Sequence, residues 1–278
     1  MKNINHFLSK TSIRFLDHSN KITIFKESNN ALTSFAIDDA IATTVGKNLA
    51  PPTVRMWVHD QTVVLGIPDS RLPHLEVGIN YLQKQGYNIV IRNSGGLAVL
   101  IDKNVLNMSF ILPNNKLSIY DGYDLMYHFI QELFKEFTTE IKAYEITGSY
   151  CPGDYDLSIH GIKFAGISQR RVRNGVAVQI YLDVGGNSKE RASIIKKFYE
   201  LSKQDSETKY TYPHVNPNVM GTISDLLQTK FTIQQVINRI RRFIQARSEI
   251  VDLSLLHEEK PIFKKRLQQM NKRNEKIK

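Results

Sequence analysis

Hydrophobic positions along the chain follow two spacings, and this pattern predicts a mixture of strands and amphipathic helices. Apolar residues recur at helical spacing in segments 36–45, 121–137, 188–202, 223–229 and 233–246. Runs rich in β-branched residues predict strands at 53–59, 61–66, 88–92, 97–101, 106–112, 155–160, 162–167 and 176–182. The last two helices each begin with a capping box, formed by Thr222 with Asp225 and by Thr232 with Gln235.

The connections between the predicted strands are mostly too short for the crossover helices of a parallel sheet. His160-Gly161 and Asn174-Gly175 are turn dipeptides, and Asp60 alone separates the first two strands, which predicts a hairpin or a bulged strand there. We therefore expect an α+β fold with mixed, largely antiparallel sheets covered by helices. It comprises an N-terminal extension (1–30), one catalytic domain (31–250) and a charged C-terminal tail (251–278).

Composition places the chain among ordinary globular proteins. It has 278 residues, of which 41% are hydrophobic and 23% charged, enough to build a sizeable core. No apolar run reaches the roughly 18 residues of a membrane span, and the first residues lack the continuous apolar stretch of a secretory signal. We expect a cytoplasmic location and no membrane partner.

The formal net charge of +10 raises the alternative of a noncatalytic nucleic-acid-binding protein. Half of this excess lies in Glu258–Lys278, where eight basic residues stand against three acidic ones. This tail has few apolar residues and no interleaved aromatics, so the pattern favours a frayed, solvated end. We expect no nucleic-acid partner.

Two stretches carry candidate chemistry. The first, Arg92–Val99 (RNSGGLAV), lies between two predicted strands, and its glycine pair lets the backbone approach a ligand closely. A plain hairpin turn is the alternative interpretation of this stretch. The second, Gly148–Asp156 (GSYCPGDYD), places the single cysteine, Cys151, in a loop. One cysteine cannot form an intrachain disulfide or a multi-cysteine metal site, so we expect no metal.

Cys151 has two interpretations, a nucleophile and a small buried apolar residue. Lys163 follows twelve residues later, on the next predicted strand, and a hairpin would turn it back toward the cysteine loop. A nearby cation would favour the reactive thiolate. Histidines could instead supply a base, and the spacing singles out none of them: His59, His74, His128, His160 and His214.

The two stretches together resemble a known family. RNSGGLAV resembles the signature of the biotin and lipoate protein ligase catalytic domain, and DLSIHGIKFAGISQRR resembles the acyl-binding strand pair of that superfamily with its lysine. SYCPGDYDLS followed by GIKFAGISQRR resembles one branch, the octanoyl-[glycine cleavage H protein]:protein N-octanoyltransferases of lipoate assembly. The resemblance covers roughly residues 30 to 250 and implies the fold of that catalytic domain.

This resemblance also implies roles for individual residues. Cys151 would be the acyl-thioester nucleophile, and Lys163 would favour its thiolate and steady the acyl carbonyl. The acyl chain and its carbonyl end would be lined by Arg92, Ser94, Gly95, Gly96, Ala98 and Val99. A second wall would be formed by Asp156, Gly166 and Ile167.

The implied reaction moves an octanoyl or lipoyl group from a lysine of glycine cleavage H protein to a lysine of a lipoyl domain in a 2-oxoacid dehydrogenase complex. Donor and product are both amides, so the exchange should need neither ATP nor metal, and we expect no cofactor. Two related activities remain as alternatives: a transferase that takes octanoate from acyl carrier protein, and an ATP-dependent lipoate ligase.

Overall fold

A mixed sheet of eight strands forms the centre of the computed structural model, which describes Leu8, residues 12–114 and residues 117–277. In chain order its strands are β1 (Ile13–Asp17), β4 (Thr53–Trp57), β8 (Val105–Pro113), β9 (Lys142–Ala143), β10 (Asp156–Ile159), β11 (Ile162–Val172), β12 (Gly175–Asp183) and β13 (Ile250–Val251). Their order across the sheet is β13-β1-β4-β8-β12-β11-β10-β9. Only the β13-β1 and β1-β4 pairs are parallel, so the predicted fold class is confirmed.

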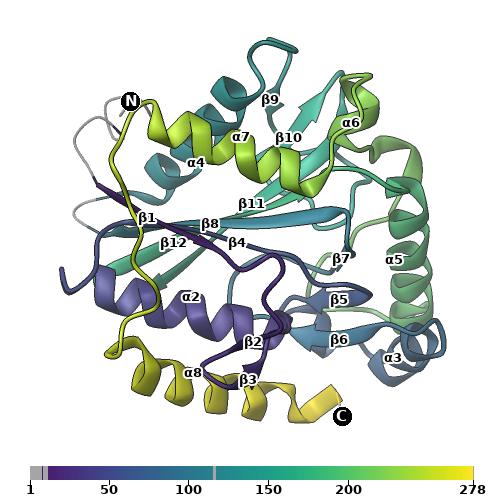
Figure 1. Ribbon diagram of the computed structural model, residues 1–278. Coiled ribbons are helices and arrows are strands. Elements are labelled where there is room, and N and C mark those ends of the chain that lie inside the picture. The colour runs from purple at the N-terminus through teal and green to yellow at the C-terminus, as the bar shows by residue number, and fades with distance from the viewer. Residues whose placement is uncertain (1–7, 9–11, 115–116, 278) are drawn as a thin grey trace.

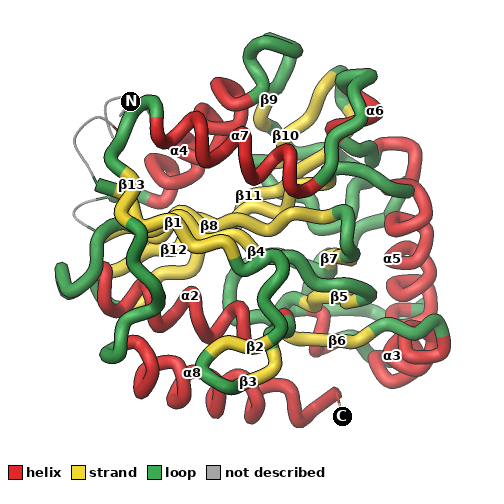
Figure 2. Tube along the Cα trace, viewed as in Figure 1, coloured by secondary structure: helices red, strands yellow, loops and turns green. Residues whose placement is uncertain are grey.

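Helices and two smaller sheets surround this sheet (Figures 1 and 2). The smaller sheets are β6-β5-β7 (Asn88–Ile91, Thr62–Leu65, Val99–Ile101) and the ribbon β2-β3 (Thr23–Ile24, Glu27–Ser28). The helices are α2 (Ala31–Val45), α3 (Leu75–Lys84), α4 (Ile119–Leu133), α5 (Ser188–Lys203), α6 (Ile223–Leu226), α7 (Ile233–Gln245) and α8 (Glu259–Asn274). Figure 1 shows α4 and α7 on one side of the large sheet and α2 with α8 on the other. Within the described ranges no helix has the length and apolarity of a membrane span.

The hairpin or bulged strand expected around Asp60 is wrong. The two predicted strands are β4 and β5, and they belong to different sheets. The chain leaves β4 after Trp57 and turns at Gln61, whose φ is +41°, before β5 begins. The turns at His160-Gly161 and at Asn174-Gly175, in contrast, join antiparallel neighbours, as predicted.

The two faces of the large sheet differ in polarity because side chains alternate along each strand. On β8 the residues Leu106, Met108 and Phe110 pack into the core under α4 and α7. Their neighbours Asn107 and Ser109 point to the opposite face, toward α2. The same alternation on β4 and β12 places Arg55 and Gln179 on this face, where both donate hydrogen bonds to Asp38 of α2.

Most of the described part of the predicted tail is the helix α8, so the expectation of a frayed end is wrong. Phe263 and Met270 of α8 are buried, and α8 packs along α2. Nearly every residue of α2 is buried, so this helix needs cover on its outer side as well. Lys264, Lys265 and Lys272 of α8 are exposed, whereas Arg266 pairs with Asp39 of α2, so the charges that suggested a solvated segment lie only partly in solvent.

The predicted N-terminal extension contributes β1 to the large sheet, while residues 1–7 and 9–11 lie outside the described residues, as does Lys278. A buried ion pair joins this first strand to the last helix. Arg14 of β1 donates two hydrogen bonds to the carboxylate of Glu259, and both side chains are fully buried. Thr44 of α2 also donates to Glu259. The division of the chain at residues 30 and 250 stays a prediction.

Glu259→Ala is expected to lower the free energy of unfolding by about 3 to 5 kcal/mol, because it leaves the Arg14 guanidinium buried and unpaired. Urea denaturation measures the change. Glu258→Ala is the matched control, since Glu258 is exposed and makes no capping hydrogen bond, and its effect should stay within about 0.5 kcal/mol. Equal effects of the two substitutions would contradict this account of α8.

Candidate active site

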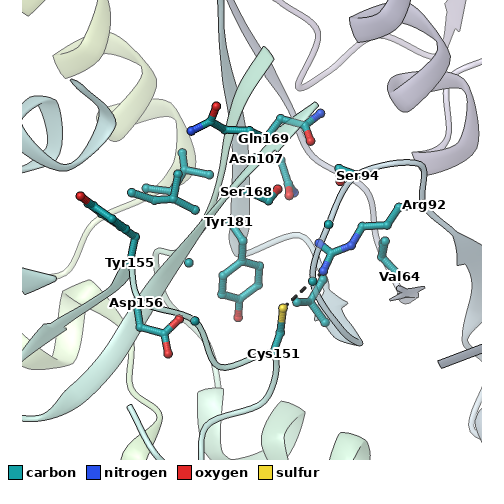
Figure 3. A pocket seen from close by; sticks show the side chains of 18 of the residues that line it. Val64, Arg92, Ser94, Asn107, Cys151, Tyr155, Asp156, Ser168, Gln169 and Tyr181 are labelled. Carbon is teal, nitrogen blue, oxygen red and sulfur yellow. Dashed lines mark hydrogen bonds between the residues drawn. The ribbon is translucent and has the colours of Figure 1, made fainter. Parts of the chain in front are cut away.

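A cavity of about 460 Å³ opens on the α2 side of the large sheet, where the sheet meets β5, β7 and two loops. The loops are the two that carried candidate chemistry in the sequence, Arg92–Ala98 and Gly148–Tyr155. Figure 3 shows side chains from both loops and from the large sheet around the same space. The two loops that the sequence marked as candidate chemistry therefore line one cavity of the fold.

Cys151 lies at the junction of the two loops and is half-buried. Its sulfur accepts hydrogen bonds from the backbone N–H of Leu97 at 3.1 Å and from Nη2 of Arg92 at 3.3 Å. Figure 3 shows the Cys151 sulfur and the Arg92 guanidinium pointing toward one another. The φ of Cys151 is +48°, a conformation that non-glycine residues rarely adopt and that is often found at functional positions. The sulfur is therefore in direct contact with two hydrogen-bond donors, one of them a cation.

Lys163 reaches the cysteine loop through its backbone. Its ammonium donates to the carbonyl oxygens of Tyr150 at 2.9 Å and Cys151 at 2.8 Å, and it pairs with Asp156 at 2.8 Å. Burial raises the pKa of the Asp156 carboxyl, and the neighbouring Lys163 opposes that shift. The structure thus brings Lys163 to the loop that carries the cysteine, whereas the cation in contact with the sulfur is Arg92.

The glycine pair allows the two loops to meet. Gly96 has a φ of +96°, and a Cβ built there would lie 2.3 Å from Nη2 of Arg92 and 2.8 Å from the sulfur of Cys151. A Cβ on Gly95 would meet nothing within 4 Å. Of the two glycines, Gly96 alone must lack a side chain for Arg92 to reach the sulfur of Cys151.

A buried hydrogen-bond chain holds the far end of the same loop. The Ala98 N–H donates to the hydroxyl of Tyr199, which donates to Asp69, and Asp69 also accepts from the Gly66 N–H. Burial raises the pKa of Asp69 to about 6, although the hydrogen bonds from Gly66 and Tyr199 act in the opposite direction. The loop is thus anchored by a carboxyl group that titrates near neutral pH.

Most of the site residues proposed from the sequence line this one cavity: Arg92, Ser94, Gly95, Gly96, Val99, Cys151, Asp156, Lys163, Gly166 and Ile167. Ala98 is the exception, because its side chain is fully buried and its N–H binds Tyr199. Ser94 and Arg92 each keep a buried polar atom without a partner, Oγ and Nε respectively. Unpartnered buried polar atoms beside a cavity are available to a ligand.

Sequence reasoning missed the contribution of β4, β8 and β12. Trp57, Asn107 and Gln179 line the cavity, and each has a buried polar atom without a partner: Nε1, Nδ2 and Oε1. Tyr181 also lines it, and its hydroxyl bonds to that of Tyr150, the neighbour of Cys151. Burial raises the pKa of Tyr150, so this pair stays protonated at neutral pH. The sequence did carry a signal for these residues. In β8 and β12, which are otherwise apolar, polar side chains occupy alternate positions and therefore share one face of the sheet.

None of the five candidate histidine bases lines the cavity, His160 and His214 included. His59 bonds to Ser34, and burial, reinforced by Arg55, lowers its pKa to about 3. His74 and His128 bond to Ser206 and Gln131. In the part of the chain that the structure describes, the sulfur of Cys151 has hydrogen bonds only to Arg92 and Leu97, and no group of three or more His, Cys, Asp or Glu could hold a metal ion.

The chain is similar to known proteins over nearly its whole length. The family described as "Lipoyl protein ligase A/B catalytic domain" matches residues 30–245. A protein of Oceanobacillus iheyensis named "Octanoyl-[GcvH]:protein N-octanoyltransferase" is 53% identical, with 99% of both chains covered. A protein of Listeria monocytogenes named "Lipoyl-[GcvH]:protein N-lipoyltransferase" is 45% identical, again over 99% of both.

Solved structures show the same fold at low sequence identity. Lipoate-protein ligase A bound with ATP superposes with a TM-score of 0.72 at 15% identity, covering 96% of this chain and 98% of that one. A putative lipoate protein ligase from T. acidophilum with bound lipoic acid gives a TM-score of 0.69 at 16% identity, covering 93% and 95%. The resemblance proposed from RNSGGLAV and the cysteine loop is confirmed.

Gly96→Ala is expected to slow alkylation of Cys151 by iodoacetamide about tenfold or more, because the added methyl group displaces Arg92 or the sulfur from their contact. Intact-mass spectrometry follows the reaction without ambiguity, since the chain has a single cysteine. Gly95→Ala is the control and should react at the wild-type rate. Equal rates for the two variants would refute the role given to Gly96.

Asp69→Asn is expected to change the pH dependence of stability. The pKa of Asp69 rises from 3.8 to about 6 on folding, so its protonation stabilises the folded chain below about pH 4, and this contribution is lost as the pH rises through 6. The loss amounts to roughly 3 kcal/mol at about 1.4 kcal/mol per pKa unit. Urea unfolding of both proteins between pH 4 and 7 should show that the variant lacks this decline. If the free energy of unfolding of the two proteins depends on pH in the same way, the assignment of this effect to Asp69 is wrong.

Proposed function

The chain belongs to the lipoyl protein ligase A/B catalytic-domain family, and on that premise we propose that it is an octanoyl-[GcvH]:protein N-octanoyltransferase with a thioester on Cys151. It takes an octanoyl or lipoyl group from a lysine of glycine cleavage H protein and gives it to a lysine of a lipoyl domain in a 2-oxoacid dehydrogenase complex. Its relatives of this type are named for the donor, GcvH. A cytoplasmic location stays a prediction from the sequence.

The observation that carries the proposal is the position of the Cys151 sulfur at the cavity, between the Arg92 guanidinium and the Leu97 N–H. A thiol reacts as its thiolate, and both donors favour that form. The positive φ of Cys151 holds the side chain at the junction of the loops. An ATP-dependent ligase of this fold has no step that requires such a nucleophile.

The first half-reaction forms the enzyme thioester. The Cys151 sulfur attacks the carbonyl carbon of the donor amide, the carbon–sulfur bond forms, and the carbon–nitrogen bond breaks. The proton of the thiol ends on the departing lysine amine, so no other reactant is consumed. An amide is a weak electrophile because of its resonance, and donors around the carbonyl oxygen are needed to stabilise the oxyanion. Leu97 N–H and Arg92 are the groups already placed beside the sulfur.

Lys163 acts on the loop that carries the nucleophile. Its ammonium binds the carbonyls of Tyr150 and Cys151 and is itself held by Asp156. These contacts keep the loop in the conformation with positive φ at Cys151. In the second half-reaction an acceptor lysine attacks the thioester and restores the thiol, so both steps use the same arrangement.

The cavity suits an eight-carbon acyl chain. Phe35, Val64 and Val99 give it apolar lining, while Trp57 adds a large ring. At about 0.8 kcal/mol per buried methylene, burial of the chain supplies several kcal/mol while the carrier protein is exchanged. The volume of about 460 Å³ is within the range of small-molecule sites. Both octanoyl and lipoyl groups contain this chain, so the proposal includes both.

Mixing the enzyme with octanoylated GcvH is expected to add the mass of one octanoyl group to the enzyme, because the thioester is an intermediate. Intact-mass spectrometry detects the adduct, which hydroxylamine should remove. Cys151→Ala should give no adduct and lose acyl transfer by at least about a thousandfold, as expected when a nucleophile is removed. Continued transfer by Cys151→Ala would defeat the thioester mechanism.

Two further arms separate the alternatives. Octanoyl acyl carrier protein in place of octanoyl-GcvH tests the other donor, and faster adduct formation from it would assign the chain to that activity. Octanoate with ATP and an acceptor domain tests the ligase, for which pyrophosphate release and an active Cys151→Ser variant are expected. A lipoylated GcvH donor, compared with the octanoylated one, measures acyl preference.

A further inference from the structure

The C-terminal end of α8 contacts the strand that leads into the active-site loop. Asn274 is buried, with 3% of its surface exposed. Its Oδ1 accepts from the N–H of Ile91 at 2.7 Å, and its Nδ2 donates to the carbonyl of the same residue at 3.1 Å. Nδ2 also donates to the carbonyl of Met270 in α8 at 2.8 Å. One side chain amide thus satisfies both backbone groups of Ile91 and ties them to the helix.

Ile91 is the last residue of β6, an edge strand paired only with β5. The next residue, Arg92, donates its N–H to Leu65 of β5, so the backbone groups of Ile91 point the other way, to the open edge. Unpaired groups at a sheet edge must find other partners. Asn274 occupies the position of a missing neighbouring strand at the residue where β6 ends.

From Ile91 the contacts continue directly to the sulfur. Arg92 donates through Nη2 to the Leu97 carbonyl and to the sulfur of Cys151. A second α8 residue, Arg273, donates to the Arg92 carbonyl at 3.4 Å. The start of the loop is therefore fixed from α8 at two successive residues, and Arg92 extends from the fixed point to the nucleophile.

We propose that Asn274 is a positioning residue of the active site, which sets the reactivity of Cys151 through Ile91 and Arg92. It lies beyond residues 30–245, the part of the chain matched by the ligase family. The inference deepens the proposed function, because it concerns the same nucleophile, but the reactivity of the sulfur can be measured without any acyl donor.

The physical reason is that Arg92 contacts the sulfur at the end of a long, flexible side chain. Such a contact is favourable only if the backbone that carries it is already ordered, since otherwise ordering costs conformational entropy. Gly95 and Gly96 follow closely and lack side chains that would restrict the loop. The hydrogen bonds from Asn274 restrict it from the other end.

Asn274→Leu, which keeps the shape and removes the hydrogen bonds, is expected to slow iodoacetamide alkylation of Cys151 about tenfold. Single-turnover octanoylation should slow by a similar factor. The KM for octanoyl-GcvH, measured in steady-state transfer, should stay unchanged, because a residue that is 3% exposed offers almost no surface to a carrier protein. Asn271→Leu is the matched control, an exposed asparagine of the same helix, and should keep the wild-type rates. Wild-type reactivity in a folded Asn274→Leu protein would overturn the inference.

A double-mutant cycle with Arg92→Met separates positioning from general destabilisation. If Asn274 acts through Arg92, the double variant should be alkylated no more slowly than Arg92→Met alone. Independent, multiplicative losses would overturn the inference. Should Asn274→Leu fail to fold, Asn274→Gln retains the amide one methylene farther out and is expected to react at an intermediate rate, whereas a wild-type rate would count against the proposal.

The same measurements distinguish this inference from the proposed function. If wild-type enzyme forms no octanoyl adduct but Asn274→Leu lowers alkylation, the function fails and the positioning role stands. If the wild type forms the adduct and Asn274→Leu has the wild-type rates of alkylation and octanoylation, the positioning role is wrong and the proposed function stands.

Discussion

The contact on which the site depends is the approach of two loops to one sulfur atom. The Cys151 loop leads into the large sheet, whereas the Arg92 loop lies between two strands of the small one. They meet where Gly96 leaves room for the sulfur beside Arg92 and the Leu97 N–H. A thiolate needs compensating donors, and here they come from the opposite loop. The relative placement of the two sheets is therefore part of the chemistry.

Several buried polar connections maintain that placement. Asp69 and Tyr199 hold the far end of the Arg92 loop, and Asp156 and Lys163 hold the cysteine loop. Asp38 accepts hydrogen bonds from Arg55, Ser109 and Gln179, and so joins α2 to the polar face of the large sheet. Each carboxyl group is buried with its hydrogen-bond partners, which makes the geometry specific because any displacement leaves a buried polar group unsatisfied.

The sequence predicted the parts of this protein whose signals are local. Hydrophobic periodicity located the main helices and strands, and the glycine pair and lone cysteine marked both loops. It could not predict that Arg92, which precedes Cys151 by 59 residues, would contact the sulfur while Lys163 binds the loop backbone. Which cation contacts the sulfur depends on how the two sheets pack against each other, and that packing has no local signal in the sequence. The tail was misjudged because its apolar residues, Phe263 and Met270, are spaced by seven among many charges.

The pairing of Arg14 with Glu259 has a consequence for the biosynthesis of the enzyme. These residues are separated by 245 positions, so Arg14 emerges from the ribosome long before its counter-ion. Until α8 is made, the outer surface of α2 stays bare and the edge of β6 lacks Asn274. A nascent chain can assemble most of its sheet early, yet Ile91 gains its hydrogen bonds to Asn274 only after α8 has been made.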